Sequence, residues 1–335
     1  MTGVTGRPFY VAQSRAALSL ACAAALTCGA LAAPDATRFY VTSAASSLVP
    51  QGLAAAAPTG AETAAFQQVP PPGVRFVPTE SQATTAPWID SNGSRFQRGI
   101  QKANYATLPA GSAPLAAAEA FTFNVDAILN PDPSDVEELG KMLRFLKTHD
   151  QPPLPVMANI GVVDDRSPML GEVLNLLTRR NLLYRVVSAP DRTLNLTIQL
   201  GTQDFPTEAA ANPSEFAARV RAKLGDDNRL VRLYGTSTVI ARLTGDGKIA
   251  RLYLLSYGGR RAQPGGAPSG QRGQQGQQAQ GIRVRLLGRY QPVRFAAYGA
   301  APDAKLIEVE HPGNATEFSV PAFTTSAIID LNAVR

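Results

Sequence analysis

The chain has 335 residues, of which 44% are hydrophobic and 17% charged, and its formal net charge is +6. This composition excludes a chain that is disordered throughout, and the length allows about two globular domains. The only cysteines, Cys22 and Cys28, lie in one N-terminal apolar stretch, and the only histidines are His149 and His311. Removal of that stretch would exclude disulfides, thiolate metal sites and cysteine nucleophiles. We therefore expect neither a cofactor nor a bound metal.

The N-terminus has the pattern of a secretory signal peptide. Arg7 and Arg15 precede an apolar run over 16–26, and small residues follow as far as Ala33. The run is short for a transmembrane helix, which needs about 20 apolar residues. We expect cleavage near Ala33, no membrane span afterwards, and a secreted or periplasmic protein. The modest positive charge does not indicate nucleic-acid binding, which requires basic residues concentrated on one face.

The segment after the signal peptide has little secondary-structure pattern. Residues 34–80 are rich in Ala, Ser, Thr, Gln and Pro and show neither helical nor strand periodicity. We expect a mostly unstructured spacer here. Residues 81–133 are interpreted as the irregular beginning of an α/β domain, with a helix over 113–121 and a short strand over 121–129.

Helix and strand patterns then alternate as far as residue 225. Ser134 and Glu137 have the spacing of a capping box at the start of a helix over 135–148. A nearly continuous apolar run over 156–163 has the pattern of a buried parallel strand. The remaining expected elements are a helix beginning at Ser167-Pro168, strands over 182–187 and 194–200, and a helix over 214–224. Together they predict a small three-layer, flavodoxin-like α/β domain over 81–229.

From Leu230 the hydrophobic period changes to 2. Two expected strands, over 239–243 and 249–255, flank Asp246-Gly247, which is a strong hairpin signal. Further strands are expected over 281–287, 293–298, 306–309, 317–320 and 327–331. The pattern predicts a C-terminal antiparallel β-sandwich over 230–335.

One connection in this region, residues 258–280, is rich in Gly, Gln, Pro and Arg. A segment this polar buries too little apolar surface to offset the entropy of ordering it, so we expect a disordered loop. The alternative is an arm that binds polyanions through Arg260, Arg261 and Arg272.

Two groups of carboxylates are candidates for catalysis. Asp164 and Asp165 are adjacent at the carboxyl end of a buried strand, where open α/β sheets place ligands and where such a pair could hold Mg²⁺ or orient a sugar hydroxyl. The alternative is that one caps the next helix and the other is solvated. Glu119 and Asp126 could form a glycosidase-like carboxylate pair, although their spacing is also that of ordinary helix and loop acids.

A candidate ligand-binding segment surrounds the single tryptophan. Trp88 is followed by Asp90, Asn92 and Arg95, which combine an aromatic ring with polar side chains. Proteins bind sugars with this combination: the aromatic side chain stacks on one face of the sugar ring, and polar side chains form hydrogen bonds at its edge. The alternative is a turn whose tryptophan fills the core beneath it.

Two family resemblances follow from these segments. The segment 162–165, Val-Val-Asp-Asp, resembles the opening motif of response-regulator receiver domains, but the strand over 194–200 lacks the aspartate that this family carries on a later strand. The second resemblance is to the accessory tail of bacterial β-galactosidase-like glycoside hydrolases. The segments that carry it are Ile160–Asp165, Leu252–Tyr257, Gly281–Gly288 and Ser326–Leu331.

The second resemblance implies a carbohydrate-associated architecture. In that family a flavodoxin-like module and a small β-sandwich follow a catalytic (β/α)₈ barrel that carries two glutamates. A barrel of at least about 200 residues does not fit before residue 150, so no catalytic residue is carried over. Our first hypothesis is an exported, non-catalytic protein that binds carbohydrate or assists a carbohydrate-active partner at the cell envelope. The alternatives are a glycoside hydrolase with paired carboxylates and a structural envelope protein.

Overall fold

The computed structural model describes residues 38–78, 85–258 and 281–334. The expected signal peptide lies outside these residues, as do residues 259–280 of the expected loop, including Arg260, Arg261 and Arg272. In the described ranges, no helix has both the length and the apolar character that a membrane crossing requires.

A five-stranded parallel sheet, in the order β2-β1-β7-β6-β3, forms the N-terminal part of the fold. Its strands are β1 (Phe39–Val41), β2 (Ala55–Ala56), β3 (Gln67–Gln68), β6 (Lys102–Leu108) and β7 (Asp126–Pro131). Three of the five come from the segment expected to be an unstructured spacer, so that prediction is wrong for residues 38–78. These strands are only two or three residues long, too short to produce a periodic pattern, and their pairing depends on partners far along the chain.

The helices were largely foreseen. The α-helices are α1 (Gly93–Gln97), α2 (Ala113–Phe123), α3 (Val136–Thr148), α4 (Pro168–Arg179) and α5 (Pro213–Leu224), and the 3₁₀ helices are η1 (Ser43–Leu48), η2 (Gly60–Ala65), η3 (Pro133–Asp135), η4 (Thr207–Ala211) and η5 (Asp226–Asn228). Ser167 caps α4 as predicted, because its side chain accepts a hydrogen bond from the Leu170 amide. The predicted Ser134–Glu137 capping box is wrong: Asp135 is the N-cap of α3, and its carboxylate instead accepts bonds from the Gly111 and Ala113 amides before α2.

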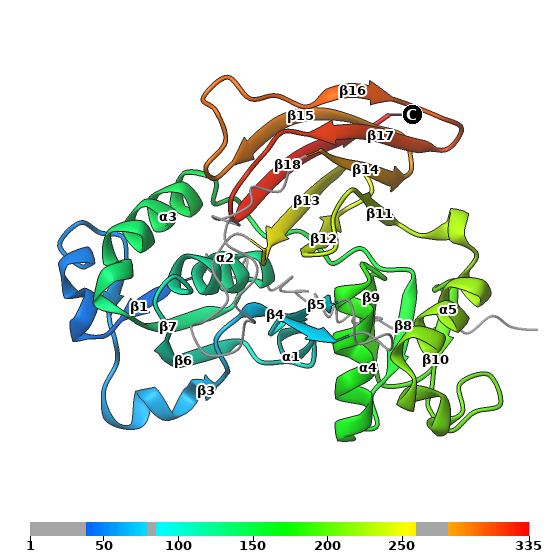
Figure 1. Ribbon diagram of the computed structural model, residues 1–335, viewed down its shortest axis with the longest axis horizontal. Helices are drawn as coiled ribbons and strands as arrows, with labels where there is room; N and C mark the ends of the chain where they lie inside the picture. The colour runs from blue at the N-terminus through cyan, green and yellow to red at the C-terminus, as the bar shows by residue number, and fades with distance from the viewer. Residues whose placement is uncertain (1–37, 79–84, 259–280, 335) are drawn as a thin grey trace, which may run out of the picture. The chain divides into compact units, whose positions relative to one another are not determined.

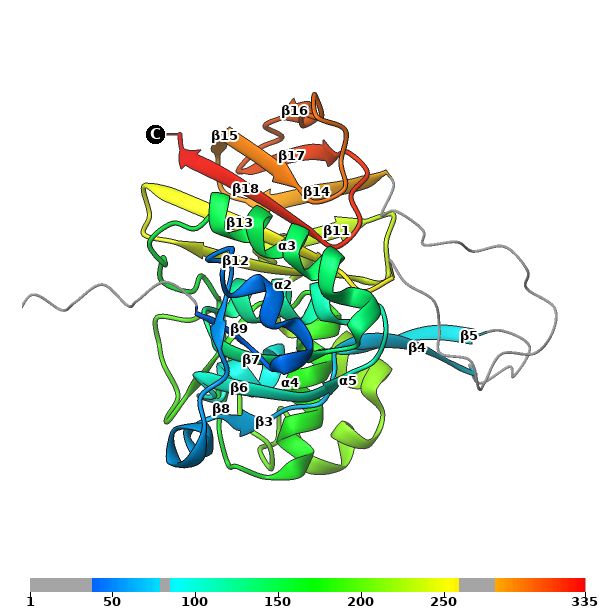
Figure 2. The same cartoon turned by 90° about the vertical axis from the view of Figure 1, so that its left-hand side faces the viewer.

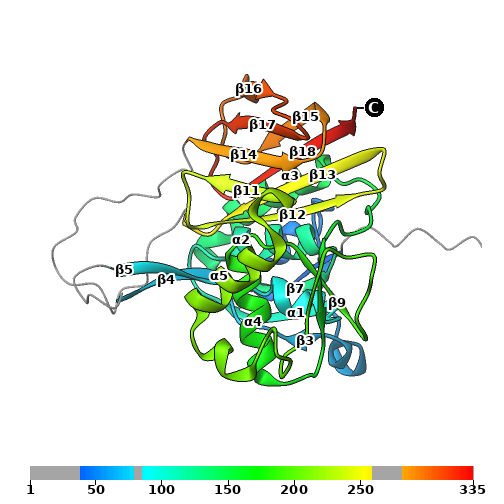
Figure 3. The same ribbon diagram turned by 90° about the vertical axis from the view of Figure 1, so that its right-hand side faces the viewer.

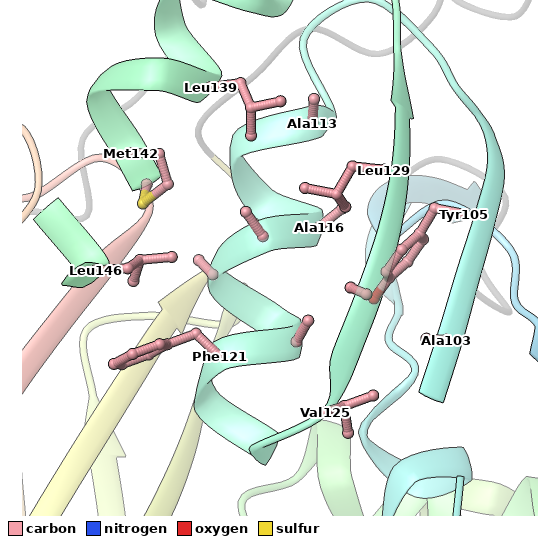
Figure 4. Packing of buried hydrophobic residues seen from close by; sticks show 14 of the residues in the cluster. Ala103, Tyr105, Ala113, Ala116, Phe121, Val125, Leu129, Leu139, Met142 and Leu146 are labelled. Carbon is pink, nitrogen blue, oxygen red and sulfur yellow. The ribbon is translucent and has the colours of Figure 1, made fainter. Parts of the chain in front are cut away.

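Helix α2 is the centre of the largest hydrophobic core. Ten of its 11 residues are buried, and five of these are alanines, which let neighbouring elements approach closely. Figure 4 shows α2 between the strand that carries Leu129 and the helix that carries Leu139, Met142 and Leu146. The helix is therefore covered on opposite sides by the parallel sheet and by α3.

Between β3 and α1 the chain forms a separate antiparallel hairpin of β4 (Gly73–Pro78) and β5 (Thr85–Asp90). Figures 2 and 3 show the two strands side by side as a ribbon that extends away from the other sheets. Arg75 and Trp88 are direct partners in its register.

A second parallel sheet has three strands, in the order β10-β8-β9. They are β8 (Ile160–Val163), β9 (Tyr184–Val187) and β10 (Leu196–Ile198), each within a segment predicted to be a strand. Their core is completed by side chains from α4 and α5. We expected these strands to belong to the same α/β domain as β7, but β7 pairs only within the five-stranded sheet.

Two four-stranded antiparallel sheets form the C-terminal part, in the orders β11-β14-β17-β16 and β12-β13-β18-β15. Their strands are β11 (Val231–Tyr234), β12 (Val239–Gly245), β13 (Ile249–Ser256), β14 (Ile282–Leu287), β15 (Tyr290–Ala297), β16 (Ile307–Glu310), β17 (Ala315–Val320) and β18 (Ser326–Ala333). The hairpin predicted at Asp246-Gly247 is confirmed by the pairing of Gly245 with Ala250. One hydrophobic cluster, including Leu252, Val284 and Phe318, draws side chains from both sheets.

The β12-β13-β18-β15 sheet is buried on both faces. Alternate residues, among them Ile240, Tyr253, Leu255 and Ile328, belong to the core that contains α2 and α3. Figure 1 shows these helices beneath the sheet, and the described residues belong to one compact unit. The predicted combination of α/β and antiparallel β structure is confirmed, but the two parts share a core.

Candidate functional site

Trp88 lies beside two arginines on the hairpin and on α4. The guanidinium of Arg179, at the C-terminal end of α4, is 3.7 Å from the centre of the Trp88 ring, and that of Arg75 is 5.5 Å from it. Arg75 also forms a bidentate pair with Asp90, at 2.9 and 3.3 Å. The structure thus brings Trp88 and Asp90 together, and a cation covers the aromatic face expected to stack on a sugar.

Arg179 differs from Arg75 in having no carboxylate partner among the described residues. Its Nε is inaccessible to solvent and donates to no hydrogen-bond acceptor among the described residues. Burial lowers the pKa of Arg179 to about 10, and the nearby positive charge of Arg180 acts in the same direction. The guanidinium remains protonated at neutral pH, with hydrogen-bonding capacity that the described residues do not use.

The other two expected ligand-binding residues are placed differently. Asn92 is 1% exposed, and its side-chain amide donates to the Pro70 carbonyl at 2.9 Å and to Glu119 Oε2 at 3.0 Å. Arg95 is exposed and donates to Asn92 Oδ1 at 3.3 Å. Asn92 therefore has a structural role beneath the hairpin, in place of the expected contact with a ligand.

Glu119 is fully buried on α2 and accepts hydrogen bonds at both carboxylate oxygens. Oε1 accepts from the Ser91 hydroxyl and the Asn92 amide, both at 2.8 Å, and from the Tyr257 hydroxyl at 2.6 Å. Oε2 accepts from the Asn92 side chain and, at 3.0 Å, from the Tyr105 hydroxyl. Burial, reinforced by the Glu119 charge, raises the pKa values of Tyr105 and Tyr257 well above the ordinary 10.

This arrangement supports a structural role for Glu119. A buried charge is tolerated when donors surround it, and here the donors come from the end of β5, from β6 and from the residue after β13. The carboxylate borders neither of the two described cavities. A general acid or base needs a reacting atom within hydrogen-bond reach, and the described contacts of Glu119 are all internal.

The remaining candidate carboxylates are also held in local contacts. Asp164 forms a bidentate pair with Arg98, at 2.7 and 3.2 Å, and accepts a bond from the Arg166 amide. Asp165 is exposed and accepts from the amide of Ser167, which is itself the N-cap of α4, so neither aspartate caps this helix. Asp126 accepts from the backbone and guanidinium of Arg38. Neither described cavity is lined by any of these carboxylates.

Arg242, a residue of β12, lines two small cavities. The first has a volume of about 20 Å³ and is lined mainly by apolar side chains together with Tyr184 and Thr178. The second, of about 30 Å³, is more polar and is lined by Thr122, Asp150 and Thr244 among others. Within the described ranges, no group of three or more His, Cys, Asp or Glu side chains is placed to hold a metal ion.

The sequence did not indicate which residues would contact Trp88 and Glu119 or line the two cavities. The sequence places Arg179 beside Arg180 at a helix end, where a solvated dipole contact is the usual role and anion binding is the alternative, but nothing in the sequence indicates the contact with Trp88. Tyr105, Tyr257 and Arg242 occupy ordinary strand positions or the end of a strand. Arg242 between Ala241 and Leu243 has the ordinary alternation of a strand with one solvated face, so the sequence gives no signal that this arginine lies beside the shared core.

Comparisons with known proteins give weak structural similarities. No protein-family model and no curated protein matches the chain. Among solved structures, it is similar to α-L-fucosidase isoenzyme 2 from Paenibacillus thiaminolyticus, with 9% identity and a TM-score of 0.46 over 67% of this chain and 57% of that one. A catalytic mutant of a GH42 β-galactosidase from G. stearothermophilus matches with 7% identity and a TM-score of 0.35 over 80% and 53% of the two chains.

A third similarity is to an α-amylase from H. orenii, with 8% identity and a TM-score of 0.18 over 72% of this chain and 57% of that chain. The chain thus spans little more than half of the length of each of these glycoside hydrolases. Similarities of this size do not establish a common fold, so the function is argued from the residues of this chain.

Proposed function

We propose that this is an exported, non-catalytic protein that binds acidic carbohydrate at the cell envelope through a surface formed by Arg75, Trp88 and Arg179. The observation that carries the proposal is the Arg179 guanidinium, which lies 3.7 Å from the Trp88 ring centre and has no carboxylate partner among the described residues. An acidic sugar supplies a carboxylate for the cation and an apolar ring edge for the indole.

The charge distribution favours Arg179 over Arg75 as the group that meets the ligand. Arg75 is already paired with Asp90, whereas the pKa of Arg179 is lowered by burial, so a bound anion would stabilise its charged form. A neutral sugar offers no such compensation. Arg180, the next residue, is exposed and adds positive charge beside the same surface.

The non-catalytic part of the proposal is supported by the candidate carboxylates. Glu119 is surrounded by internal donors, Asp164 is paired with Arg98, and Asp126 is paired with Arg38. A glycosidase needs two carboxyl groups about 5 to 10 Å apart across a substrate site. The second described cavity has one carboxylate, Asp150, and the first has none.

The proposal also includes an assignment of two parts of the fold to known types of module. We interpret the β10-β8-β9 sheet with α4 and α5 as a reduced flavodoxin-like unit, and the two C-terminal sheets as a β-sandwich, as in accessory modules of glycoside hydrolases. The parallel strand order and the hydrophobic cluster shared by the two antiparallel sheets support this interpretation.

Isothermal titration calorimetry with defined oligosaccharides tests the proposal. We expect the full chain to bind oligogalacturonate more tightly than a neutral cello-oligosaccharide of equal length. Arg179→Gln is expected to weaken the acidic interaction about tenfold or more, because a hydrogen-bonded charge pair is lost. Arg192→Gln is the matched control, since Arg192 is exposed and makes no described contact with Arg75, Trp88 or Arg179.

Trp88→Ala should weaken binding to the acidic oligosaccharide as well, while circular dichroism shows an unchanged fold. Absence of binding to acidic and neutral oligosaccharides would favour the structural envelope protein. Equal affinity of Arg179→Gln and the unmodified chain for the acidic oligosaccharide would contradict the proposed binding surface.

A further inference from the structure

Arg242 lies where three parts of the fold meet. It belongs to β12, and its guanidinium lies 4.4 Å from the ring centre of Phe123 at the end of α2. The first of the two cavities that it lines is bordered by Phe123 and by Tyr184 of the three-stranded sheet, and the second by residues of α2 and of the segment after α3. Junctions between structural units are frequent places for ligand sites.

The nearby carboxylate of Asp330 forms its ion pairs with arginines other than Arg242. Arg251 of β13 and Arg294 of β15 both bind Asp330 of β18, each at 2.6 Å. Arg242 forms no ion pair with any described residue, and its Nε is inaccessible to solvent without a hydrogen-bond partner. A guanidinium in this position has unused donors in a region from which water is partly excluded.

A second polar atom without a hydrogen-bond partner belongs to a residue that lines the second cavity. Thr122 lines the second cavity, is 4% exposed, and its Oγ1 has no hydrogen-bond partner among the described residues. The cavity measures about 30 Å³, on a scale where one water needs about 10–15 Å³. It therefore has room for two water molecules or for a two-oxygen head group of similar size.

Asp150 also lines this cavity, but it is not within ion-pair distance of Arg242. Burial raises the pKa of Asp150, and this increase is opposed first by a hydrogen bond from the Gln151 backbone and then by the positive charge of Arg251. The charge of Arg242 is not compensated by an ion pair with a described carboxylate.

We propose that the second cavity binds the carboxylate of a small organic acid, with Arg242 as its cationic partner and Thr122 as a hydrogen-bond donor. The planar guanidinium matches the two oxygens of a carboxylate, which distinguishes this ligand from a spherical anion. The site is separate from the Arg75, Trp88 and Arg179 surface and does not depend on its function.

Titration of the full chain with ¹³C-labelled formate, followed by NMR at constant ionic strength, tests this site. We expect saturable binding that Arg242→Gln weakens about tenfold or more. Thr122→Val keeps the side-chain shape and removes the hydroxyl, so it should weaken binding several-fold while the fold is retained.

Asp150→Asn should change formate affinity in the opposite direction. Removal of a negative charge from the cavity should tighten formate binding about three- to tenfold, since like charges no longer approach each other. This variant also keeps the proposal testable if Arg242→Gln fails to fold. Exposed Asp165→Asn, on the α4 side of the fold, is the matched charge control and should leave formate binding unchanged.

The competing explanation is a pair of waters that bridges Arg242 and Asp150. In that case neither the unmodified chain nor Asp150→Asn shows saturable formate binding, and the proposal is overturned. Formate binding that is insensitive to both Arg242→Gln and Thr122→Val overturns it too. Chloride that competes as strongly as formate would overturn the assignment to a carboxylate.

Discussion

The hydroxyl of Tyr257 donates a 2.6 Å hydrogen bond to Oε1 of Glu119, joining residues 138 positions apart in the sequence. Glu119 lies on α2, and Tyr257 follows β13, so one buried contact connects the parallel α/β part with a C-terminal sheet. The same carboxylate holds the chain at Ser91 and Asn92, directly before α1. Glu119 therefore stabilises the packing of segments that have no local reason to meet.

Removal of this contact should destabilise the fold. Tyr257→Phe is expected to lower the free energy of unfolding by about 1–3 kcal/mol, because a hydrogen bond to a buried charge is lost. Glu119→Ala should cost about 3–5 kcal/mol, since it leaves several buried donors without an acceptor. Urea denaturation measures both variants and their double mutant.

A double-mutant cycle checks the coupling between the two side chains. Contacting residues of this kind have interaction energies of about 0.5–3 kcal/mol. Tyr290→Phe, remote from Glu119 in the fold, serves as a tyrosine control whose effect should add to that of Glu119→Ala. Additivity in the Tyr257 cycle would contradict the structural role assigned to this hydrogen bond.

The Arg98–Asp164 pair should make stability depend on pH. The hydrogen bond from Arg98 lowers the pKa of Asp164 below its ordinary 3.8, although burial opposes this shift. The folded state then binds the Asp164 proton less tightly than the unfolded state does. The contribution of the pair is complete above about pH 4 and is lost as pH falls through the lower folded-state pKa.

Urea unfolding between pH 2.5 and 7 measures this dependence. Asp164→Asn should lower stability at pH 7 and flatten the acid limb of the profile. Asp165→Asn is the matched control, because Asp165 is exposed and has no described ion pair. An unchanged acid limb in Asp164→Asn would show that other carboxylates account for the acid sensitivity.

Gly93 at the start of α1 should not tolerate a side chain. A Cβ atom there would lie 2.5 Å from Cζ of Phe123, which is buried and packs against Phe96 and Arg242. Gly93→Ala is therefore expected to cost about 1–3 kcal/mol through overpacking. Gly73→Ala is the control, since nothing lies within 4 Å of its Cβ position. Equal melting temperatures for the two variants would refute the predicted clash.

The sequence was informative where a pattern extended over several residues. The helices α3, α4 and α5 and the β12–β13 hairpin follow from hydrophobic periodicity and from local signals such as Ser167 and Asp246-Gly247. The strands in residues 38–78 could not be predicted, because each is stabilised by pairing with a distant strand. The capping role expected of Ser134 failed because Asp132 accepts the Ser134 amide and hydroxyl, and Asp135 reaches the start of α2 instead.

The candidate site was predictable only in part. The sequence singled out Trp88, Asp90, Asn92 and Glu119 by residue type, and the structure separates them into a surface pair and a buried pair. The partners Arg179 and Tyr257 come from distant elements, so no spacing along the chain indicates them. Local chemistry identified individual residues, and tertiary packing determined which of them share an environment.

The double-sided burial of the β12-β13-β18-β15 sheet limits how the chain can be divided for experiments. A fragment that began at Leu230 would leave Ile240, Leu255 and Ile328 facing solvent, and such an apolar sheet surface promotes aggregation. The roles of the two parts are therefore better separated by point substitutions in the shared core. A truncation at Leu230 would expose the apolar surfaces that the sheet and the helices bury against each other.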